Sequence, residues 1–573
     1  MLPSSDEGAG SGGAGRSGLR RWAPLVAIVA VVVVVGGALL LTSGDGDDSA
    51  STTTAASAGT LTAEELPEGV LPFEVAEAEG IDVDWPDTCD TERGTVAYPS
   101  FFAPSCYAPF EGDNGGATDE GVTADRIKIV WYLAPDVDPI IDFISEGISD
   151  DTAADTRATV EGFNEFFATF AETYGREVDL EFYEATGTAD DEIAARADAV
   201  AIAEDAKPFM VMNGPQLTSA FAEELAARGV SCLQCGPTQP QEFYAEADPH
   251  LLTVSMSAEQ GQFHTAAFVG RQLAGRPAEF AGDDLASEER VFGLVYLNSI
   301  ENAEEVQDQF EQRLADEGAT LAESVGYDSP VTLQTTAANV IAKLKDAGVT
   351  TVLFAGDPVA PRELTREATA QGWFPEWMVT PSSILVDTNV FSRTYDQEQW
   401  AHAFGVSTTA VHVNPSNQGS AFLYEWFFGE EPTADDTVAL LSAQLNTFYN
   451  VIQGVGPTLT RQAFRDTIFA AEPTPSAVTQ PSLSWGDKGI WPETDWLGID
   501  DATLVWWDPE AEGPDERGDV APGMWQYVDG GVRYLPDEWP AGDPALFDAE
   551  GAVAIYEQPP EGEAIPDYPS PAG

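Results

Sequence analysis

The sequence predicts an α/β protein with two similar lobes, each built on a central, mostly parallel sheet flanked by helices, and a ligand cleft between the lobes. Two observations support this prediction. The order strand, helix, strand, helix, strand occurs twice, over residues 127–215 and 291–358, and this alternation produces parallel sheets with right-handed crossovers. The 573 residues are 43% hydrophobic and 10% aromatic, which is enough for a large core and about two to four domains.

The predicted elements follow from hydrophobic periodicity. In the first repeat, apolar runs at 127–133, 178–183 and 208–212 predict strands, and they are separated by helices over 157–174 and around Ile193. In the second repeat, strands are expected at 291–297, 320–325 and 350–354, with helices around Phe310 and Ile341. Later helices are predicted at 434–455 and 459–464. Two short strands, 504–507 and 523–528, could form a hairpin, and we expect the last ~20 residues to be disordered.

The N-terminus predicts a membrane anchor. Arg16, Arg20 and Arg21 precede an apolar run over residues 22–41, whose length of ~20 residues can span a hydrocarbon core. Arginines before the run place the N-terminus inside the cell. We expect an uncleaved single-pass anchor in the cell membrane with the bulk of the chain extracytoplasmic, and a long cleaved signal peptide is the alternative.

The charge balance excludes one class of partner. The chain has 25 Lys and Arg against 97 Asp and Glu, a net charge of −72. Nucleic-acid binding needs a basic face that releases counterions, so we expect no nucleic-acid partner. A strongly acidic surface suits a secreted or salt-adapted protein.

The four cysteines form two close pairs, Cys89 with Cys106 and Cys232 with Cys235. In an oxidising compartment each pair predicts a local disulfide. The Cys232/Cys235 spacing also occurs in thiol redox sites and in half of a zinc site, which remain as alternatives.

Catalytic signatures are scarce, because the chain has no HExxH, GxSxG, GxxxxGK[ST] or strand-following GxGxxG motif. The histidines His250, His264, His402 and His412 are dispersed, and we expect each to be a surface or packing residue. We therefore expect no enzyme, no cofactor and no metal.

The strand ends predict the binding site, because ligands of open parallel sheets bind outside the carboxyl ends of the strands. Applied to both repeats, this rule selects loops rich in glycine, hydroxyl and aromatic residues, which suit a small polar ligand. Ordinary turns use the same small residues. The candidate ligand-binding residues are Trp131, Tyr132, Thr218, Ser219, Thr238, Asp357 and Ser382.

Four segments resemble a known family: GVTADRIKIV at 121–130, GVSCLQCGPT at 229–238, RVFGLVY at 290–296 and LKDAGVTTVLFAG at 344–356. They resemble substrate-binding proteins of ABC importers, of the branched-chain amino-acid (Leu/Ile/Val) type, over about residues 121–470. The resemblance implies the type I periplasmic-binding-protein fold, hinge closure on a ligand, and an ABC permease as partner.

The resemblance also implies which residues contact ligand. Family positions that hold the amino-acid carboxylate fall near 216–219 and 236–238. Ser382 stands where the family commonly has an acidic partner for the ammonium group, and Glu301 and Asp357 replace aromatic covers. These departures weigh against a free amino acid, and the implied ligand is a small polar one, amino-acid-like, an amide or a related compound.

The predicted organisation is sequential: a disordered cytoplasmic tail (1–21), an anchor (22–42), a stalk and disulfide-containing extension (43–120), lobe 1 (121–250), lobe 2 (251–385), return segments (386–472) and an irregular Trp/Pro/Gly-rich extension (473–573). The predicted function is capture of a small solute and delivery to a permease. A membrane-anchored surface receptor, sensor or structural protein with the same fold is the alternative.

Overall fold

A computed structural model of the chain describes residues 62–139, 141, 149–298, 303–383 and 385–573. The predicted tail, membrane anchor and first part of the stalk lie outside these residues, as does Glu301. Within the described part of the chain, no helix combines the length and the apolar character needed to cross a membrane.

Lobe 1 contains a five-stranded sheet in which every neighbouring pair of strands is parallel. The strand order is β4-β3-β5-β6-β7. The strands are β3 (Arg126–Leu133), β4 (Glu177–Glu184), β5 (Met210–Met212), β6 (Ser231–Leu233) and β7 (Leu251–Leu252). The helices between them are α3 (Ala153–Phe170), α4 (Glu192–Ala201), which a π-helical turn extends over Ile202–Ala206, α5 (Ala220–Ala227) and α6 (Gln241–Glu246).

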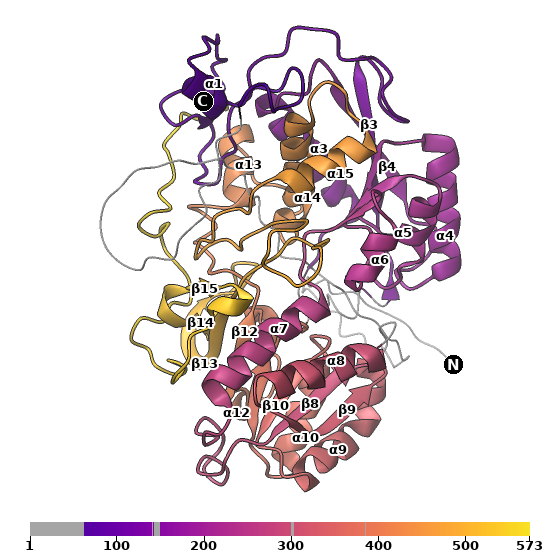
Figure 1. Ribbon diagram of the computed structural model, residues 1–573. Helices are drawn as coiled ribbons and strands as arrows, with labels where there is room; N and C mark the ends of the chain where they lie inside the picture. The colour runs from indigo at the N-terminus through magenta and orange to yellow at the C-terminus, as the bar shows by residue number, and fades with distance from the viewer. Residues whose placement is uncertain (1–61, 140, 142–148, 299–302, 384) are drawn as a thin grey trace, which may run out of the picture.

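Lobe 2 repeats this order in an eight-stranded sheet, β9-β8-β10-β11-β12, followed by antiparallel β13 and β14, with β15 also paired to β13. The strands are β8 (Phe292–Leu297), β9 (Leu321–Tyr327), β10 (Thr351–Ala355), β11 (Glu376–Val379), β12 (Ala403–Ser407), β13 (Ala502–Pro514), β14 (Val520–Tyr527) and β15 (Arg533–Tyr534). The helices are α7 (Ala258–Phe268) with a π-helical turn over Val269–Leu273, α8 (Ala303–Asp316), α9 (Pro330–Asp346), α10 (Ala360–Ala370), α11 (Asn389–Ser392) and α12 (Gln397–Trp400). Figure 1 shows lobe 1 above lobe 2.

Local sequence explains where the helices begin. Thr152 and Asp155 form a reciprocal capping box at the start of α3, which satisfies backbone N–H groups that a first helical turn leaves open. Ser329 accepts a bond from the N–H of Thr332, and Pro330 follows it as the first residue of α9, the position where proline is tolerated. The helix α3 begins close to the predicted place, and α9 contains the predicted Ile341.

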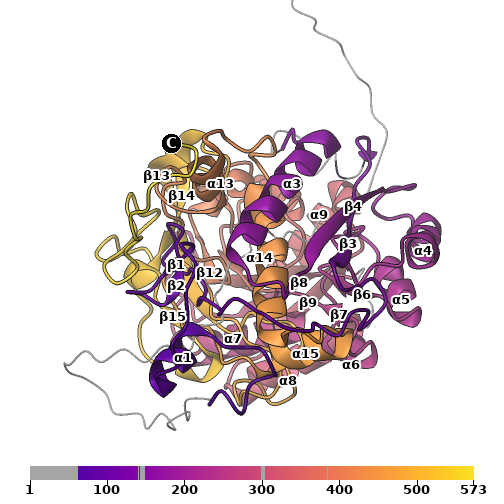
Figure 2. The same ribbon diagram turned by 90° about the horizontal axis from the view of Figure 1, so that it is seen from above.

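The segments predicted to return and complete the lobes, 386–472, divide between the two lobes. The strand β12 belongs to the sheet of lobe 2. The helices α13 (Ser420–Phe428), α14 (Val438–Val455) and α15 (Arg461–Ala470) cover lobe 1, where α14 lies beside α3 (Figure 2). The chain therefore crosses between the lobes three times, at about residues 253–257, 408–419 and 471–501.

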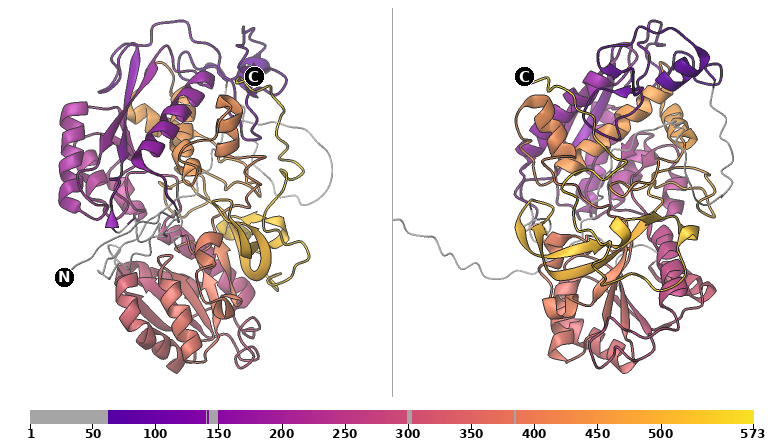
Figure 3. Two further views of the ribbon diagram at one scale, coloured as in Figure 1. Left: turned by 180° about the vertical axis from the view of Figure 1, so that it is seen from behind. Right: turned by 90° about the vertical axis from the view of Figure 1, so that its left-hand side faces the viewer.

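The C-terminal extension is more ordered than the sequence predicts. The expected strands at 504–507 and 523–528 form an antiparallel pair, and β13 continues the sheet of lobe 2 by pairing with β12 (Figure 3). The last residues, expected to be disordered, run back to lobe 1: Tyr568 donates to Asp90, and Trp426 donates to the Tyr568 carbonyl. The residues that hold this last segment, Asp90 and Trp426, are distant in the sequence, so a local pattern does not predict the contacts.

The N-terminal extension packs on lobe 1. It holds α1 (Phe73–Glu79) and the short pair β1 (Cys89–Asp90) and β2 (Thr95–Val96). The structure joins Cys89 to Cys106 and Cys232 to Cys235, with Cα atoms 5.7 Å and 5.8 Å apart, which are the predicted pairs. The Arg176 guanidinium donates to the carbonyls of Asn114, Gly116, Thr123 and Pro457, so it fastens this extension to the lobe.

Candidate functional site

The strand order places one switch point in each lobe. In lobe 1, β3 lies between β4 and β5, and in lobe 2, β8 lies between β9 and β10. At such points the connections leave in opposite directions and open a crevice at the carboxyl ends of the strands. The described loops at these ends are residues 134–139 and 213–219 in lobe 1 and 356–359 in lobe 2.

The two loops predicted to hold a ligand carboxylate pack directly against each other. A Cβ placed on Gly214 would lie 2.5 Å from the carbonyl oxygen of Cys235, and one on Gly236 would lie 3.2 Å from the carbonyl oxygen of Thr218. Only glycine permits the first of these approaches. Loops 214–219 and 235–238 therefore form one continuous surface.

The loop 214–219 also reaches the other lobe. The Leu217 side chain packs against the core of lobe 2, which contains Val295, Leu297 and Phe354. This contact is absent from the sequence prediction, because a single leucine in a turn gives no periodic signal. The residues that flank Leu217 consequently lie where the two lobes meet.

Thr218 and Ser219 stand at the N-terminus of α5. The Thr218 hydroxyl oxygen accepts a bond of 3.2 Å from the N–H of Ala220, and Ser219 Oγ donates to Glu223 at 2.8 Å. As an acceptor, Thr218 keeps its hydroxyl proton for another partner. The first turn of a helix also offers backbone N–H groups to an anion.

Thr238 and Ser382 each bond to a residue at the first crossing between the lobes or next to it. Thr238 Oγ1 donates to Ser255 Oγ at 3.4 Å, and Ser382 Oγ donates to the Ala258 carbonyl at the same distance. Both bonds are long, and both side chains are half-buried. The structure thus brings a lobe 1 hydroxyl and a lobe 2 hydroxyl to one short segment, residues 255–258.

Asp357 does not face a ligand, which corrects its prediction as a binding residue. Its carboxylate is fully buried and accepts bonds from the Tyr327 hydroxyl and from the N–H groups of Val359 and Ala360 at the start of α10. Burial raises the pKa of this carboxyl, and the three bonds offset part of the rise. Asp357 is a buried helix cap.

Trp131 and Tyr132 are core residues, which corrects a second prediction. They point to opposite faces of β3, because side chains alternate along a strand, and helices cover both faces of this sheet. Trp131 packs with α3 and α14 and is fully buried. Tyr132 packs on Phe221 and donates to Asp198 at 2.9 Å.

The candidate loops carry little charge. Residues 214–219, 235–238, 253–258, 356–359 and 380–383 contain no Lys or Arg, and their single ionisable residue, Asp357, is committed to capping. This surface therefore offers hydroxyls and backbone amides. It can orient carboxylate, amide or hydroxyl groups, whereas the neighbouring strand-end loop 134–139 carries the carboxylates of Asp136 and Asp138, which accept bonds from the N–H groups of Ala153 and Ala189.

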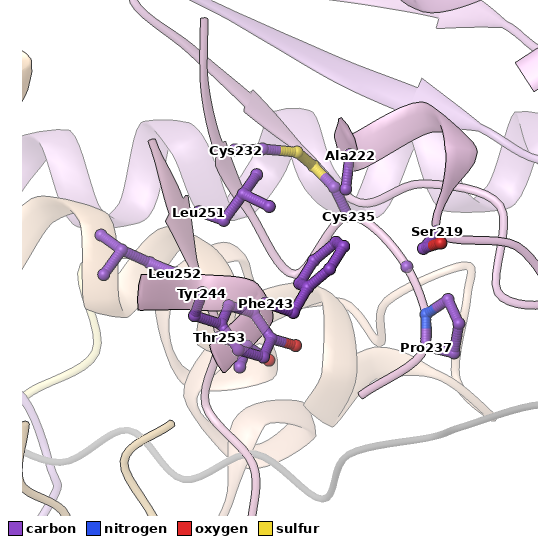
Figure 4. Close-up of a pocket in the computed structure, with 11 residues that line it drawn as sticks. Ser219, Ala222, Cys232, Cys235, Pro237, Phe243, Tyr244, Leu251, Leu252 and Thr253 are labelled. Atoms are coloured by element: carbon purple, nitrogen blue, oxygen red, sulfur yellow. A yellow bond between two sulfur atoms is a disulfide. The ribbon is translucent and has the colours of Figure 1, made fainter. Parts of the chain in front are cut away.

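A pocket in lobe 1 adjoins this surface (Figure 4). The Cys232–Cys235 disulfide and Ala222 form one side, Ser219 and Pro237 another, and the Phe243 ring lies between them. Ser219 thus contributes to the candidate surface and to the pocket wall. The disulfide is almost fully buried, and it fixes the end of β6 beneath the loops.

One group of carboxylates among the described residues has the spacing of a metal site. Asp150, Asp151 and Asp436 each offer an oxygen within 4.8 Å of the others. Asp151 accepts two bonds from Thr437, and Asp436 accepts one from the N–H of Asp150. The carboxylates of Asp151 and Asp436 therefore already accept hydrogen bonds from groups of the protein.

Comparison with known proteins gives no match to any protein-family model and none to a curated protein. Solved structures do match. The leucine-, isoleucine-, valine-, threonine- and alanine-binding protein from Brucella ovis, in its closed conformation, is 13% identical and covers 76% of this chain and 100% of its own, with a TM-score of 0.48.

A solute-binding protein of an ABC transporter from Rhodopseudomonas palustris, in complex with 3,4-dihydroxybenzoic acid, is 10% identical and covers 73% of this chain and 99% of its own, with a TM-score of 0.46. A fatty acid ABC transporter substrate-binding protein from Thermomonospora curvata is also 10% identical, with coverages of 74% and 97% and a TM-score of 0.46. Their low identities say nothing about the ligand of this chain.

Proposed function

We propose that this protein captures a small polar solute between its two lobes, outside the cytoplasm, and delivers it to an ABC permease. The observation that supports this most directly is the surface formed by loops 214–219 and 235–238 beside the first crossing. It places hydroxyls of both lobes at the point where the lobes meet. Closure on a ligand there would remove the ligand from water without any reaction.

The chemistry of this surface favours a neutral or anionic ligand. Thr218, Ser219, Thr238 and Ser382 supply hydroxyls, and the start of α5 supplies backbone N–H groups. A carboxylate or amide accepts bonds from such groups. A free amino acid would also place its ammonium group near this surface, and loops 214–219 and 235–238 contain no carboxylate. We therefore propose an organic acid or amide.

Membrane attachment through residues 22–42 belongs to the same proposal. A tether holds the binder near its permease and raises its effective concentration there. It would serve a surface receptor equally well, so co-purification with a permease separates the two roles.

A thermal-shift screen of the full chain tests the ligand proposal. Organic acids, short amides, amino acids and sugars are the probes, and a ligand at 100 times its Kd adds roughly 2.7 kcal/mol of stability. For a ligand so identified, Thr238→Ala should weaken binding about 5- to 150-fold, because a lost hydrogen bond costs about 1–3 kcal/mol. Binding is measured by titration calorimetry.

Thr335→Ala is the matched control, since Thr335 is an exposed threonine on α9 whose hydroxyl donates to the Thr332 carbonyl of the same helix. It should leave ligand affinity unchanged. If Thr238→Ala and Thr335→Ala bind the ligand equally well, the ligand does not use this surface. If no probe of any class stabilises the protein, solute capture is refuted for those classes.

A further inference from the structure

The third crossing, residues 471–501, meets the first crossing in a small backbone ribbon. The N–H of Ile499 donates to the Ser255 carbonyl, and the N–H of Ser255 donates to the Leu497 carbonyl. On its other side, Ser484 donates from its N–H to the Gly498 carbonyl. The Trp485 indole also donates to the Thr253 carbonyl. This ribbon therefore joins two of the three crossings to each other.

Asp495 connects this ribbon to a helix of each lobe. Its Oδ1 accepts bonds from Gln241 of α6 at 3.1 Å and from Gln260 of α7 at 2.8 Å, as well as from the N–H of Leu497. Its side chain is almost completely buried. One carboxylate oxygen therefore joins lobe 1, lobe 2 and the third crossing.

Asp500 lies in the same ribbon and is fully buried. Its Oδ1 accepts a bond of 2.9 Å from the Trp491 indole. The Asp495 carboxyl and the Ser484 hydroxyl are both close enough to act on the pKa of Asp500. The remaining oxygens, Asp495 Oδ2, Asp500 Oδ2 and Ser484 Oγ, have no hydrogen-bond partner of good geometry among the described residues.

The nearby cations and acids are committed elsewhere. Arg533 of β15 donates to Asp501 at 2.8 Å and to backbone carbonyls. On α7, Glu259 accepts a bond from the N–H of Gln241. Arg313 of α8 stacks on the Phe263 ring and faces Glu259 and Glu493.

His264 of α7 is neutral. The Trp539 indole donates to its Nδ1, so its Nε2 carries the proton and donates to the Asp500 carbonyl. No described cation therefore neutralises the Asp495 and Asp500 carboxyls.

We infer that Asp495 and Asp500 share a proton that holds the third crossing against α6 and α7, so that the hinge is fastened at neutral pH and released at alkaline pH. One hydroxyl proton, from Ser484, cannot serve both open carboxylate oxygens, and a proton held by the pair would supply the second donor. Ionising both of two neighbouring buried carboxyls that lack a counter-ion is energetically unfavourable. Burial raises the pKa of Asp495 to about 6 and that of Asp500 to about 8.

A metal ion is the other species that could satisfy these oxygens. Ca²⁺ takes six to eight oxygen ligands, whereas three open side-chain oxygens are present here. The donors on the two Oδ1 atoms also leave those atoms unavailable. A proton fits this number of open acceptors better, and the inference does not depend on which solute the cleft binds.

Two measurements on the full chain test the shared proton. Infrared difference spectra between about pH 7 and about pH 9 should show the loss of a protonated-carboxyl band, which Asp500→Asn should lack. Amide hydrogen exchange is then compared between the wild type and Asp500→Asn at the same pH. At about pH 9, the amides of residues 253–257 and 482–500 should exchange roughly tenfold faster, or more, in the wild type. Asp500→Asn should stay protected, because its neutral amide supplies a donor.

Asp487→Asn is the control, an exposed aspartate in the same crossing, and it should behave as the wild type in both measurements. If the wild type has no such band, or the band persists in both Asp495→Asn and Asp500→Asn, the shared proton is refuted. If exchange in the crossings does not change with pH beyond its intrinsic rate, the hinge role is refuted. If Ca²⁺ at neutral pH abolishes the band, the site binds a cation and the inference fails. Should Asp500→Asn not fold, the wild-type spectra and exchange still decide.

Discussion

Gly214→Ala should separate the two loops that form the candidate binding surface. The added Cβ would lie 2.5 Å from the Cys235 carbonyl oxygen, 2.7 Å from its carbonyl carbon and 3.0 Å from its Cα. Ordinary contact begins at 3.4 Å, so the loops must part by roughly 0.9 Å. These neighbours are backbone atoms beside a disulfide, and they cannot rotate away. Overpacking of this kind costs about 1–3 kcal/mol.

Urea unfolding followed by tryptophan fluorescence measures this loss as a lower midpoint at unchanged slope. Ligand affinity should fall as well, because Thr218 and Ser219 move with the loop. Gly236→Ala is the matched control on the facing loop. Its Cβ would lie 3.2 Å from the Thr218 carbonyl oxygen, which a shift of a few tenths of an ångström relieves, so its loss should be less than half as large. Equal midpoints for Gly214→Ala and the wild type would refute the direct packing of the loops.

Two further predictions concern stability. Burial lowers the pKa of His264 from 6.5 to about 3. The unfolded chain therefore binds a proton that the folded one does not, and stability is lost as pH falls from about 6.5 to about 3, by up to ~5 kcal/mol. When the free energy of unfolding is measured in urea at several pH values, it should fall less toward low pH in His264→Gln than in the wild type. An equal fall in both proteins would contradict the prediction. Glu376→Gln should cost about 3–5 kcal/mol in urea unfolding, because it leaves the buried, doubly bonded Arg290 guanidinium without its carboxylate. The ion pair between Arg366 and Glu363 on the surface is the comparison, and Glu363→Gln should cost about 0–1 kcal/mol of unfolding free energy. Equal costs for the two substitutions would show that the Glu376 pair is not buried.

The sequence predicted the repeated α/β order because the signals for strands and helices are local. The apolar run at 291–297 corresponds to β8, and the periodic apolar residues around Ile341 correspond to α9. Two such units in one chain also predicted two lobes. The cysteine pairs were predictable for the same reason, since 17 and 3 residues separate their members.

Sequence reasoning failed where burial on both sides of a sheet had to be known. Trp131 and Tyr132 follow each other at the end of β3 and resembled aromatic residues of a cleft. A parallel sheet covered by helices on both faces buries consecutive residues alike, so a run of apolar residues does not show which of them face solvent. Asp357 was predicted as a ligand contact because its burial and the donor that Tyr327 brings to its carboxylate, 30 positions away, appear only in the folded structure.

The sequence by itself determined the order of elements, the two-lobed plan and the loops that end the strands. Only the tertiary structure decided that Thr238 and Ser382 both bond to the segment 255–258, that Leu217 reaches the other lobe, and that Asp495 joins α6 to α7. These contacts link residues far apart in the chain, and their formation depends on three crossings and on the C-terminal strands that complete lobe 2. Periodicity records how a segment folds, whereas the approach of distant segments depends on packing that no single segment encodes.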